Sequence, residues 1–188
     1  AAPAPGDDPV PLVPDTAPDF VREVTVTLMA GEGDRLPVSA LPADGTFPTG
    51  TARWERRSLA AELPIWDESI CIDCAKCALV CPHAAIRMKV YPPEQLAGAP
   101  DGFPSKEWKD RQHPGRLMTI QVAPDDCTGC GICVDTCPAF AKEEVGHRSL
   151  MMEAKGPLLA AERERFEFFL DIPEADRMHA ARRGTFLD

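Results

Sequence analysis

The chain has 188 residues, of which 44% are hydrophobic, 20 are proline and 13 are glycine. Its formal net charge of -10 argues against nucleic-acid binding, because neutralising phosphates requires a basic face. No apolar run is long enough to span a membrane, and abundant cysteine without a signal peptide favours a reducing compartment. We therefore expect a soluble cytoplasmic protein, with one compact module and extended arms, that contacts neither nucleic acid nor membrane.

The first third of the chain is rich in proline and weakly periodic. Residues 1–20 hold six prolines and predict an extended arm or linker that lies on something larger. Residues 21–66 predict an irregular lead-in segment that docks on the rest of a larger protein. Within it, apolar alternation predicts a strand over residues 21–29, and a short helix is expected over residues 53–63.

The eight cysteines form two copies of one pattern, C-x2-C-x2-C-x3-C-P. The first copy is Cys71, Cys74, Cys77 and Cys81 with Pro82, and the second is Cys127, Cys130, Cys133 and Cys137 with Pro138. Corresponding cysteines are 56 residues apart, which predicts pseudo-twofold symmetry. In this spacing three thiolates hold one [4Fe-4S] cluster and the fourth ligates its neighbour.

A short helix after the third cysteine explains how the fourth one reaches the other cluster. Cys81 lies about one helical turn beyond Cys77, and the following proline ends the helix because it lacks an amide hydrogen. The predicted cofactor-binding and metal ligands are Cys71, Cys74, Cys77 and Cys137 on the first cluster, and Cys127, Cys130, Cys133 and Cys81 on the second. No catalytic residue is predicted.

Disulfides and zinc are the alternative uses of these cysteines. Disulfides need an oxidising compartment, and thiols this close together compete for partners. Zinc takes paired C-x2-C units or four cysteines per ion, which leaves the third cysteine of each triplet unexplained. Both triplets keep their middle cysteine, Cys74 and Cys130, so we expect four irons in each cluster.

The residues between the cysteines differ in the two loops. Gly129 and Gly131 let the second backbone approach its cluster closely, whereas the first loop carries Asp73, Ala75 and Lys76. The two clusters are therefore expected to differ in reduction potential. Lys76 is a candidate for tuning its cluster, with a solvated side chain as the alternative.

The cysteines lie in a segment, residues 67–148, that predicts an α+β, bacterial-type two-[4Fe-4S] ferredoxin-like domain. Alternating strands are expected over residues 85–90 and 118–122, paired antiparallel around a docking or covering insertion at residues 91–117. Residues 149–188 predict a helical exit segment whose closely spaced phenylalanines need a partner surface.

Stretches outside the cysteine spacing carry a family resemblance. They are RLPVSA at 35–40, DGTFPTGT at 44–51, PIWD at 64–67, CPHAAIR at 81–87, LAGAP at 96–100, TIQVAP at 119–124, CTGCG at 127–131 and FEFFL at 166–170. Together they resemble the ferredoxin-like domain of pyruvate:ferredoxin (flavodoxin) oxidoreductase, with its lead-in and its exit toward the thiamine domain. The resemblance covers roughly residues 20–188.

The resemblance implies that this chain is part of a larger enzyme and serves as its electron relay. That family oxidises pyruvate on thiamine diphosphate and passes single electrons through three [4Fe-4S] clusters to ferredoxin or flavodoxin. Two clusters are expected here. Thiamine diphosphate, Mg and the third cluster are expected on the remainder of the enzyme, which would form a homo-oligomer.

Two other functions compete with the relay. One is an iron-sulfur subunit of another oxidoreductase, such as a hydrogenase, and the other is a structural iron-sulfur interaction module. Electron transfer needs no acid-base residue, so we expect structural roles for His83, His113, His147 and His179.

Overall fold

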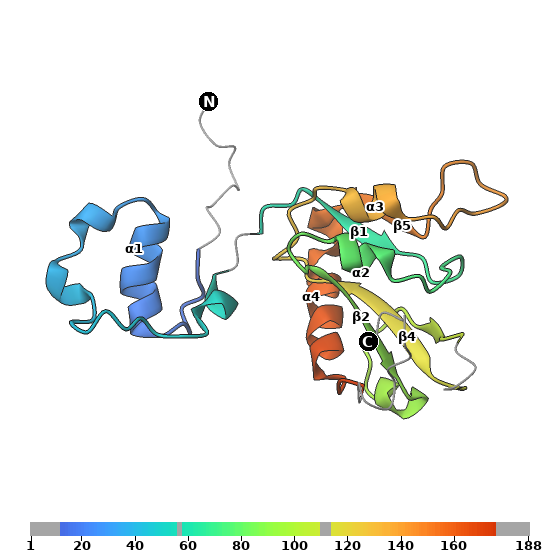
Figure 1. The fold of residues 1–188 in the computed structure, drawn as a ribbon, viewed down its shortest axis with the longest axis horizontal. Helices are drawn as coiled ribbons and strands as arrows, with labels where there is room; N and C mark the ends of the chain where they lie inside the picture. The colour runs from blue at the N-terminus through green and yellow to red at the C-terminus, as the bar shows by residue number, and fades with distance from the viewer. Residues whose placement is uncertain (1–11, 56–57, 110–113, 176–188) are drawn as a thin grey trace. The chain divides into compact units, whose positions relative to one another are not determined.

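The computed structural model describes residues 12–55, 58–109 and 114–175. The chain divides into two compact units, Ala1–Arg57 and Ser58–Asp188 (Figure 1). The second unit thus begins before residue 67, where the ferredoxin-like domain was expected to start. Within the described ranges, no helix has both the length and the apolar character needed to cross a membrane.

The first unit is built from short helical elements rather than from a strand. They are η1 (Val21–Thr25), α1 (Val26–Met29), η2 (Gly33–Arg35), η3 (Val38–Ala40) and η4 (Thr51–Trp54). The strand expected over residues 21–29 is wrong. Val21 and Val24 are both buried, and a spacing of three places them on one face of a helix. Val21 packs there with Val13 and Ala17.

The second unit combines strands with helices around the cysteine loops. Its elements are β1 (Glu62–Trp66), α2 (Lys76–Val80), β2 (Ile86–Tyr91), η5 (Pro93–Leu96), β3 (Lys106–Glu107), β4 (Leu117–Val122), α3 (Ile132–Thr136), β5 (Leu150–Ala154) and α4 (Lys155–Asp171). The helix expected over residues 53–63 is wrong, because η4 ends at Trp54 and β1 begins at Glu62.

The strands form two small antiparallel sheets. β2 pairs with β4, with Ile86 opposite Val122 and Tyr91 opposite Leu117, which confirms the predicted pairing. The insertion between these strands adds β3 to the other edge of β4. The second sheet pairs β1 with β5, with Glu62 opposite Ala154 and Trp66 opposite Leu150.

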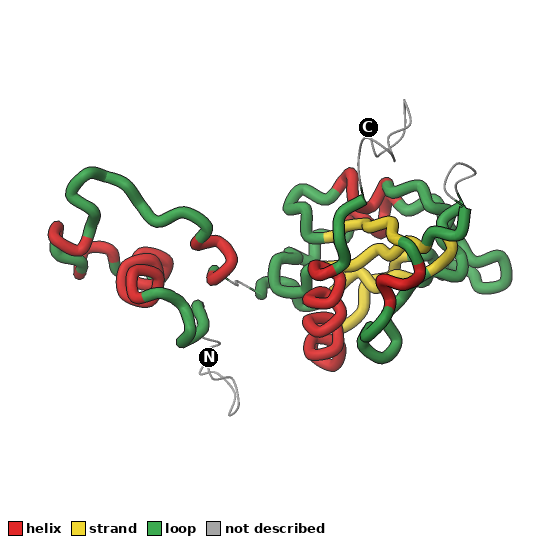
Figure 2. The backbone as a smooth tube through the Cα atoms, turned by 90° about the horizontal axis from the view of Figure 1, so that it is seen from below, coloured by secondary structure: helices red, strands yellow, loops and turns green. Residues whose placement is uncertain are grey.

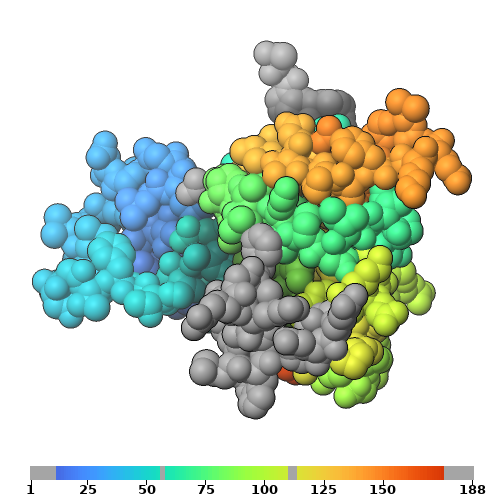
Figure 3. Space-filling model, turned by 45° about the vertical axis from the view of Figure 1, so that its right-hand side comes forward, coloured from blue at the N-terminus to red at the C-terminus, as the bar shows by residue number. Residues whose placement is uncertain are grey.

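These pairings relate two equivalent halves of the unit. One half runs β1, α2, β2 and the other runs β4, α3, β5, and each strand pairs with a strand of the opposite half. The helices at 76–80 and 132–136 keep the separation of 56 residues seen for the cysteines. The two helices contact each other, and in the space-filling view the segments that carry them lie side by side on one face (Figure 3).

The exit segment begins as a strand and continues as a helix. Residues 150–154 form β5, so the expectation of a wholly helical segment from residue 149 is wrong. Helix α4 ends at Asp171, just before Pro173, and packs against β4. Figure 2 shows the longest helix beside the strands. Phe169 is only 1% exposed, and Phe168 makes an edge contact with Phe103 at 4.9 Å between ring centroids. Part of the phenylalanine cluster is therefore covered within the unit itself.

Candidate metal centres

Each cysteine motif contributes to both of two cavities in the second unit. One cavity is lined by Cys71, Cys74, Cys77 and Cys137, which we name the first set. The other is lined by Cys127, Cys130, Cys133 and Cys81, which we name the second set. Three thiols of each set come from one motif and the fourth comes from the other, and these are the groups that the sequence predicted.

Short helices place the thiols around the cavities. In α2 the third cysteine, Cys77, lies near the start of the helix, and Cys81 directly follows its last residue in an extended conformation. Cys133 and Cys137 hold the same positions relative to α3. Because both helices span little more than one turn, the fourth thiol leaves its own loop and lines the cavity of the other set.

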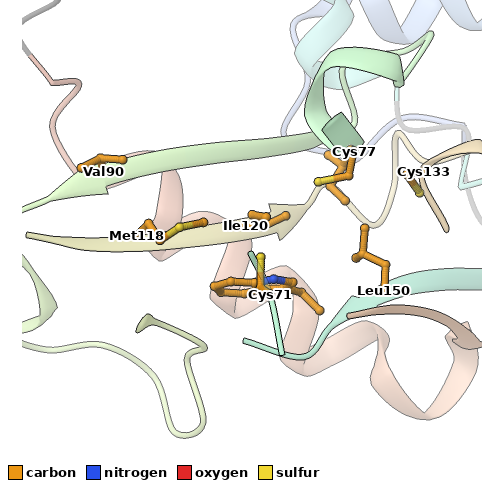
Figure 4. Close-up of a cluster of buried hydrophobic side chains, with 9 residues drawn as sticks. Cys71, Cys77, Val90, Met118, Ile120, Cys133 and Leu150 are labelled. Carbon is orange, nitrogen blue, oxygen red and sulfur yellow. The ribbon is translucent and has the colours of Figure 1, made fainter. Parts of the chain in front are cut away.

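The two cavities adjoin across the core of the unit. The buried core cluster contains cysteines from both sets together with strand residues: Trp66, Cys71, Cys77, Ile86, Val90, Met118, Ile120, Cys133 and Leu150. Figure 4 shows Cys77, Cys133 and Leu150 gathered beyond one end of β4, while Val90 and Met118 lie further along the strands. Groups bound in the two cavities would therefore be neighbours in a largely apolar surrounding.

Burial makes three of the eight thiols harder to ionise. Burial raises the pKa of Cys77 to about 12 and the pKa of Cys133 to about 11, and neighbouring thiols act in the same direction. Burial also raises the pKa of Cys127, while the amide of Gly129 and the ammonium of Lys155 oppose the rise. Metal binding must displace the thiol protons, since thiolates are the ligands of iron-sulfur clusters.

The donor set fits a multi-atom cluster better than a single ion. Across the described residues, no three or more His, Cys, Asp or Glu side chains converge closely enough to hold one metal ion. All eight cysteines are free thiols, and they surround empty volumes of about 300 and 370 Å³ that are partly open to solvent. Four thiols spread around a cavity are what a [4Fe-4S] cluster requires.

Two lysines outside the motifs lie next to the sets, and the sequence reasoning missed both. Lys106 of β3 donates to the carbonyl oxygen of Cys71 and pairs with Asp73 at 2.6 Å between Nζ and Oδ1. Lys155, the first residue of α4, is buried and donates to Ser58 at 2.6 Å. Both lysines lie far from the cysteines in sequence, so no spacing pattern connects them to the motifs. A lysine at the first position of a helix is nevertheless unusual, because the helix dipole disfavours a cation there.

Of the four histidines, His83 and His147 fall within the described residues. His147 bonds Asp67 at 2.7 Å between Nε2 and Oδ2, and His83 lines the second cavity. Trp66 lines the first cavity as part of the core. His113 and His179 lie outside the described residues.

A family model described as a 4Fe-4S dicluster domain matches residues 70–141, the region that contains both sets. We refer to residues 70–141 as the dicluster domain after this match. The match, together with the mixed strands and helices, confirms the predicted α+β ferredoxin-like fold. A second model, the EKR domain of unknown function, matches residues 6–60, which precede the dicluster domain.

Curated relatives extend this match to most of the chain. It is 54% identical over 86% of its length to pyruvate-flavodoxin oxidoreductase of Nostoc sp., and 49% identical over 89% to that of Rhodospirillum rubrum. It is also 42% identical over 84% to pyruvate:ferredoxin oxidoreductase of Moorella thermoacetica. The chain spans only 13–14% of the length of these relatives. The predicted resemblance is confirmed, and the dicluster domain corresponds to one segment of these much longer oxidoreductases.

Proposed function

We propose that this chain is the electron-relay part of a thiamine-dependent 2-oxoacid oxidoreductase that acts on pyruvate. The observation that carries the proposal is the pair of adjoining cavities, each lined by three cysteines of one motif and the fourth cysteine of the other. The eight thiols of the first and second sets are the proposed ligands of two [4Fe-4S] clusters.

The residues of the chain hold the clusters, exclude water and keep the two sites adjacent. When bound, each cluster supplies a one-electron acceptor of low potential. Trp66 and Ile120 line the first cavity, and Ile86 and Val122 line the second, so apolar side chains limit solvent access on the core side. An electron entering one site can then pass to its neighbour without acid-base chemistry.

The rest of the enzyme supplies the other parts of the proposal. The relatives' names support pyruvate as substrate and flavodoxin or ferredoxin as acceptor. We place thiamine diphosphate, Mg and a third [4Fe-4S] cluster on the remainder of the enzyme, which we propose to be a cytoplasmic homo-oligomer. Residues 21–66 are proposed to dock on that remainder, residues 67–148 to form the relay, and residues 149–188 to lead toward the thiamine domain.

The first test is the iron and acid-labile sulfide content of anaerobically prepared protein, with electron paramagnetic resonance before and after dithionite. We expect about eight irons per chain and a spin-coupled signal after reduction, because the two clusters are neighbours. Zinc in place of iron, or about four irons without coupling, would contradict the relay.

A second test separates the relay from a purely structural role. In the full enzyme, Cys74→Ser should damage the first cluster and slow acceptor reduction more than pyruvate decarboxylation. The measurement is the ratio of the two rates in variant and parent enzyme. Equal loss of both rates would favour a structural iron-sulfur module.

A further inference from the structure

We propose that Lys155 is a potential-tuning residue whose buried ammonium makes the cluster of the second set easier to reduce than that of the first. Electrons would then pass from the first set to the second. The inference rests on the proposed function, because it requires both clusters to be present.

A chain of contacts places the Lys155 ammonium beside the second set. Its Nζ donates to Ser58 Oγ at 2.6 Å, and that hydroxyl donates to Asp125 Oδ1 at 3.2 Å. Asp125 precedes Cys127 by two residues, and the Ser58 amide donates to its carbonyl oxygen at 3.0 Å. The main-chain amide of Lys155 donates to the carbonyl oxygen of Ala61, whose neighbours Ala60 and Glu62 lie against Gly129 of the second cysteine loop. Lys155 is 6% exposed, so water screens its charge weakly.

The ammonium of Lys155 is hydrogen-bonded to a neutral hydroxyl rather than directly to a carboxylate. The carboxylate of Asp125 is paired directly with Arg163, through two hydrogen bonds of 2.9 and 2.7 Å. At the first set, the single cation Lys106 forms an ion pair with the single carboxylate of Asp73, and their side chains are 12% and 8% exposed. Lys76, in the first motif, is exposed and therefore well screened. Of these three lysines, only Lys155 combines burial with the lack of a direct carboxylate partner in the described part of the chain.

This lysine occupies an unfavourable position for fold stability. It opens α4, where the helix dipole disfavours a cation, and burial of an ammonium is costly. Departures from local rules of this kind are expected at functional sites, where they have a compensating use. Stabilising the added negative charge of a reduced cluster is such a use.

Hydrogen bonds to sulfur favour the same order of potentials. The amide of Ala85 donates to Cys81 Sγ at 3.3 Å, and the amide of Gly129 donates to Cys127 Sγ at 3.4 Å. Both sulfurs belong to the second set. Their counterparts by sequence, Cys137 and Cys71, accept no backbone amide in the described part of the chain. Donors to sulfur raise the potential of an iron-sulfur cluster because they stabilise the more negative state.

The step that this order favours is a single electron transfer. The reduced cluster of the first set loses one electron and the oxidised cluster of the second set gains it, with no bond made or broken. The electron originates from the 2-oxoacid oxidation proposed for the remainder of the enzyme and leaves to an external one-electron carrier.

The decisive experiment is a redox titration of the anaerobic, cluster-loaded protein, followed by electron paramagnetic resonance. Lys155→Met should lower the equilibrium constant for reduction of one cluster about tenfold, or about 59 mV for one electron, with a much smaller change at the other. Lys155→Arg should restore most of the shift because it keeps the charge. The affected signal should be the one that Cys130→Ser removes, which assigns it to the second set.

Two further variants distinguish a charge effect from general damage. Asp125→Asn removes a negative charge from the same network and should shift the same cluster in the opposite direction, even if Lys155→Met fails to load clusters. Lys76→Met, the matched control, should change neither potential appreciably because that side chain is solvated. Two loaded clusters with unchanged potentials in Lys155→Met, or equal shifts of both, would overturn the inference while leaving the relay intact. Absence of clusters from the parent protein would instead overturn the proposed function.

Discussion

In the first cysteine loop, positions 73 and 75 are aspartate and alanine, whereas the corresponding positions of the second loop are Gly129 and Gly131. All four have a positive φ: 61° and 52° in the first loop, 71° and 75° in the second. The backbone path is therefore shared although the residues are not. Only glycine adopts this region without steric cost, so the first loop carries strain that the second one avoids.

The comparison shows two ways of holding one loop conformation. Asp73 tolerates the left-handed region better than most residues, and its carboxylate is held by Lys106 and by the amide of Lys109. The second loop instead has glycine at both positions, which adopts a positive φ without steric cost. A Cβ on Gly129 would lie 3.4 Å from the Cβ of Ala60, and one on Gly131 would meet no atom within 4 Å. One loop is thus held by an ion pair, whereas the other relies on the conformational freedom of glycine.

The largest expected effect is the loss of one cluster when the fourth cysteine of a motif is replaced by serine. Cys81→Ser should damage the cluster of the second set although Cys81 belongs to the first motif, and Cys137→Ser should damage the first. Iron content should fall toward about four per chain and the spin coupling should disappear. If Cys81→Ser and Cys74→Ser removed the same resonance signal, the proposed ligand sets would be wrong.

The next effect concerns the ion pair that anchors the first loop. Lys106→Met leaves the buried carboxylate of Asp73 without its cation, which should lower the free energy of unfolding by about 3 kcal/mol. Urea unfolding of the cluster-loaded protein measures it. Lys142→Met removes an exposed lysine and serves as the control, with a change within about 0.5 kcal/mol. Equal effects of the two variants would mean that the pair does not anchor the loop.

The glycines give a smaller effect. Gly131→Ala should cost about 1 kcal/mol, because an alanine Cβ meets no atom within 4 Å and only the positive φ opposes it. Ala75→Gly should be nearly neutral, since relief of strain at φ 52° is offset by the greater entropy of the unfolded chain and the loss of a buried methyl group. Thermal unfolding of both variants measures the contrast. A neutral Gly131→Ala would show that the loop can change its path.

The smallest effect is the pH dependence of the bond between His147 and Asp67. The pKa of His147 is raised by its hydrogen bond to Asp67, and the pKa of Asp67 is lowered chiefly by the same bond. The His147 contribution is complete below its ordinary pKa of about 6.5 and disappears as pH rises through the raised value. The Asp67 contribution is present above about pH 3.9 and disappears as pH falls through the lowered value.

His147→Gln should therefore destabilise the protein most between about pH 4 and 6.5, and less on either side. Unfolding midpoints of the parent and the variant, measured across pH, give the difference. A difference that did not change with pH would show that the bond does not depend on ionisation of the pair.

Two sequence patterns predicted parts of the fold: the spacing of the cysteines, and the alternation of apolar and polar residues along strands. Helices 76–80 and 132–136 and the pairing of β2 with β4 follow from these patterns. The strand expected at residues 21–29 failed because the positions of Val21 and Val24 fit a helix as well as a strand. β5 was missed because Met151 and Met152 do not alternate with polar residues, and its partner β1 lies far away in the sequence.

The residues of the candidate site also differ in whether the sequence could predict them. The grouping of the cysteines around the two cavities could be predicted, because thiols at fixed spacing have few uses and one helical turn carries the fourth thiol away from its own loop. Lys106 and Lys155 could not be found, because what brings them to the cysteines is tertiary packing of β3 and α4. A lysine in a sequence is ordinarily a solvated one.

The pairing of each strand with the opposite half has a consequence for oxidative injury. β1 pairs with β5 and β2 with β4, and each proposed cluster draws ligands from both motifs. An oxidant that destroyed one cluster would therefore free thiols in both halves of the unit, three in one cysteine motif and one after the short helix of the other. Damage confined to one centre would thus leave reactive thiols beside the surviving one.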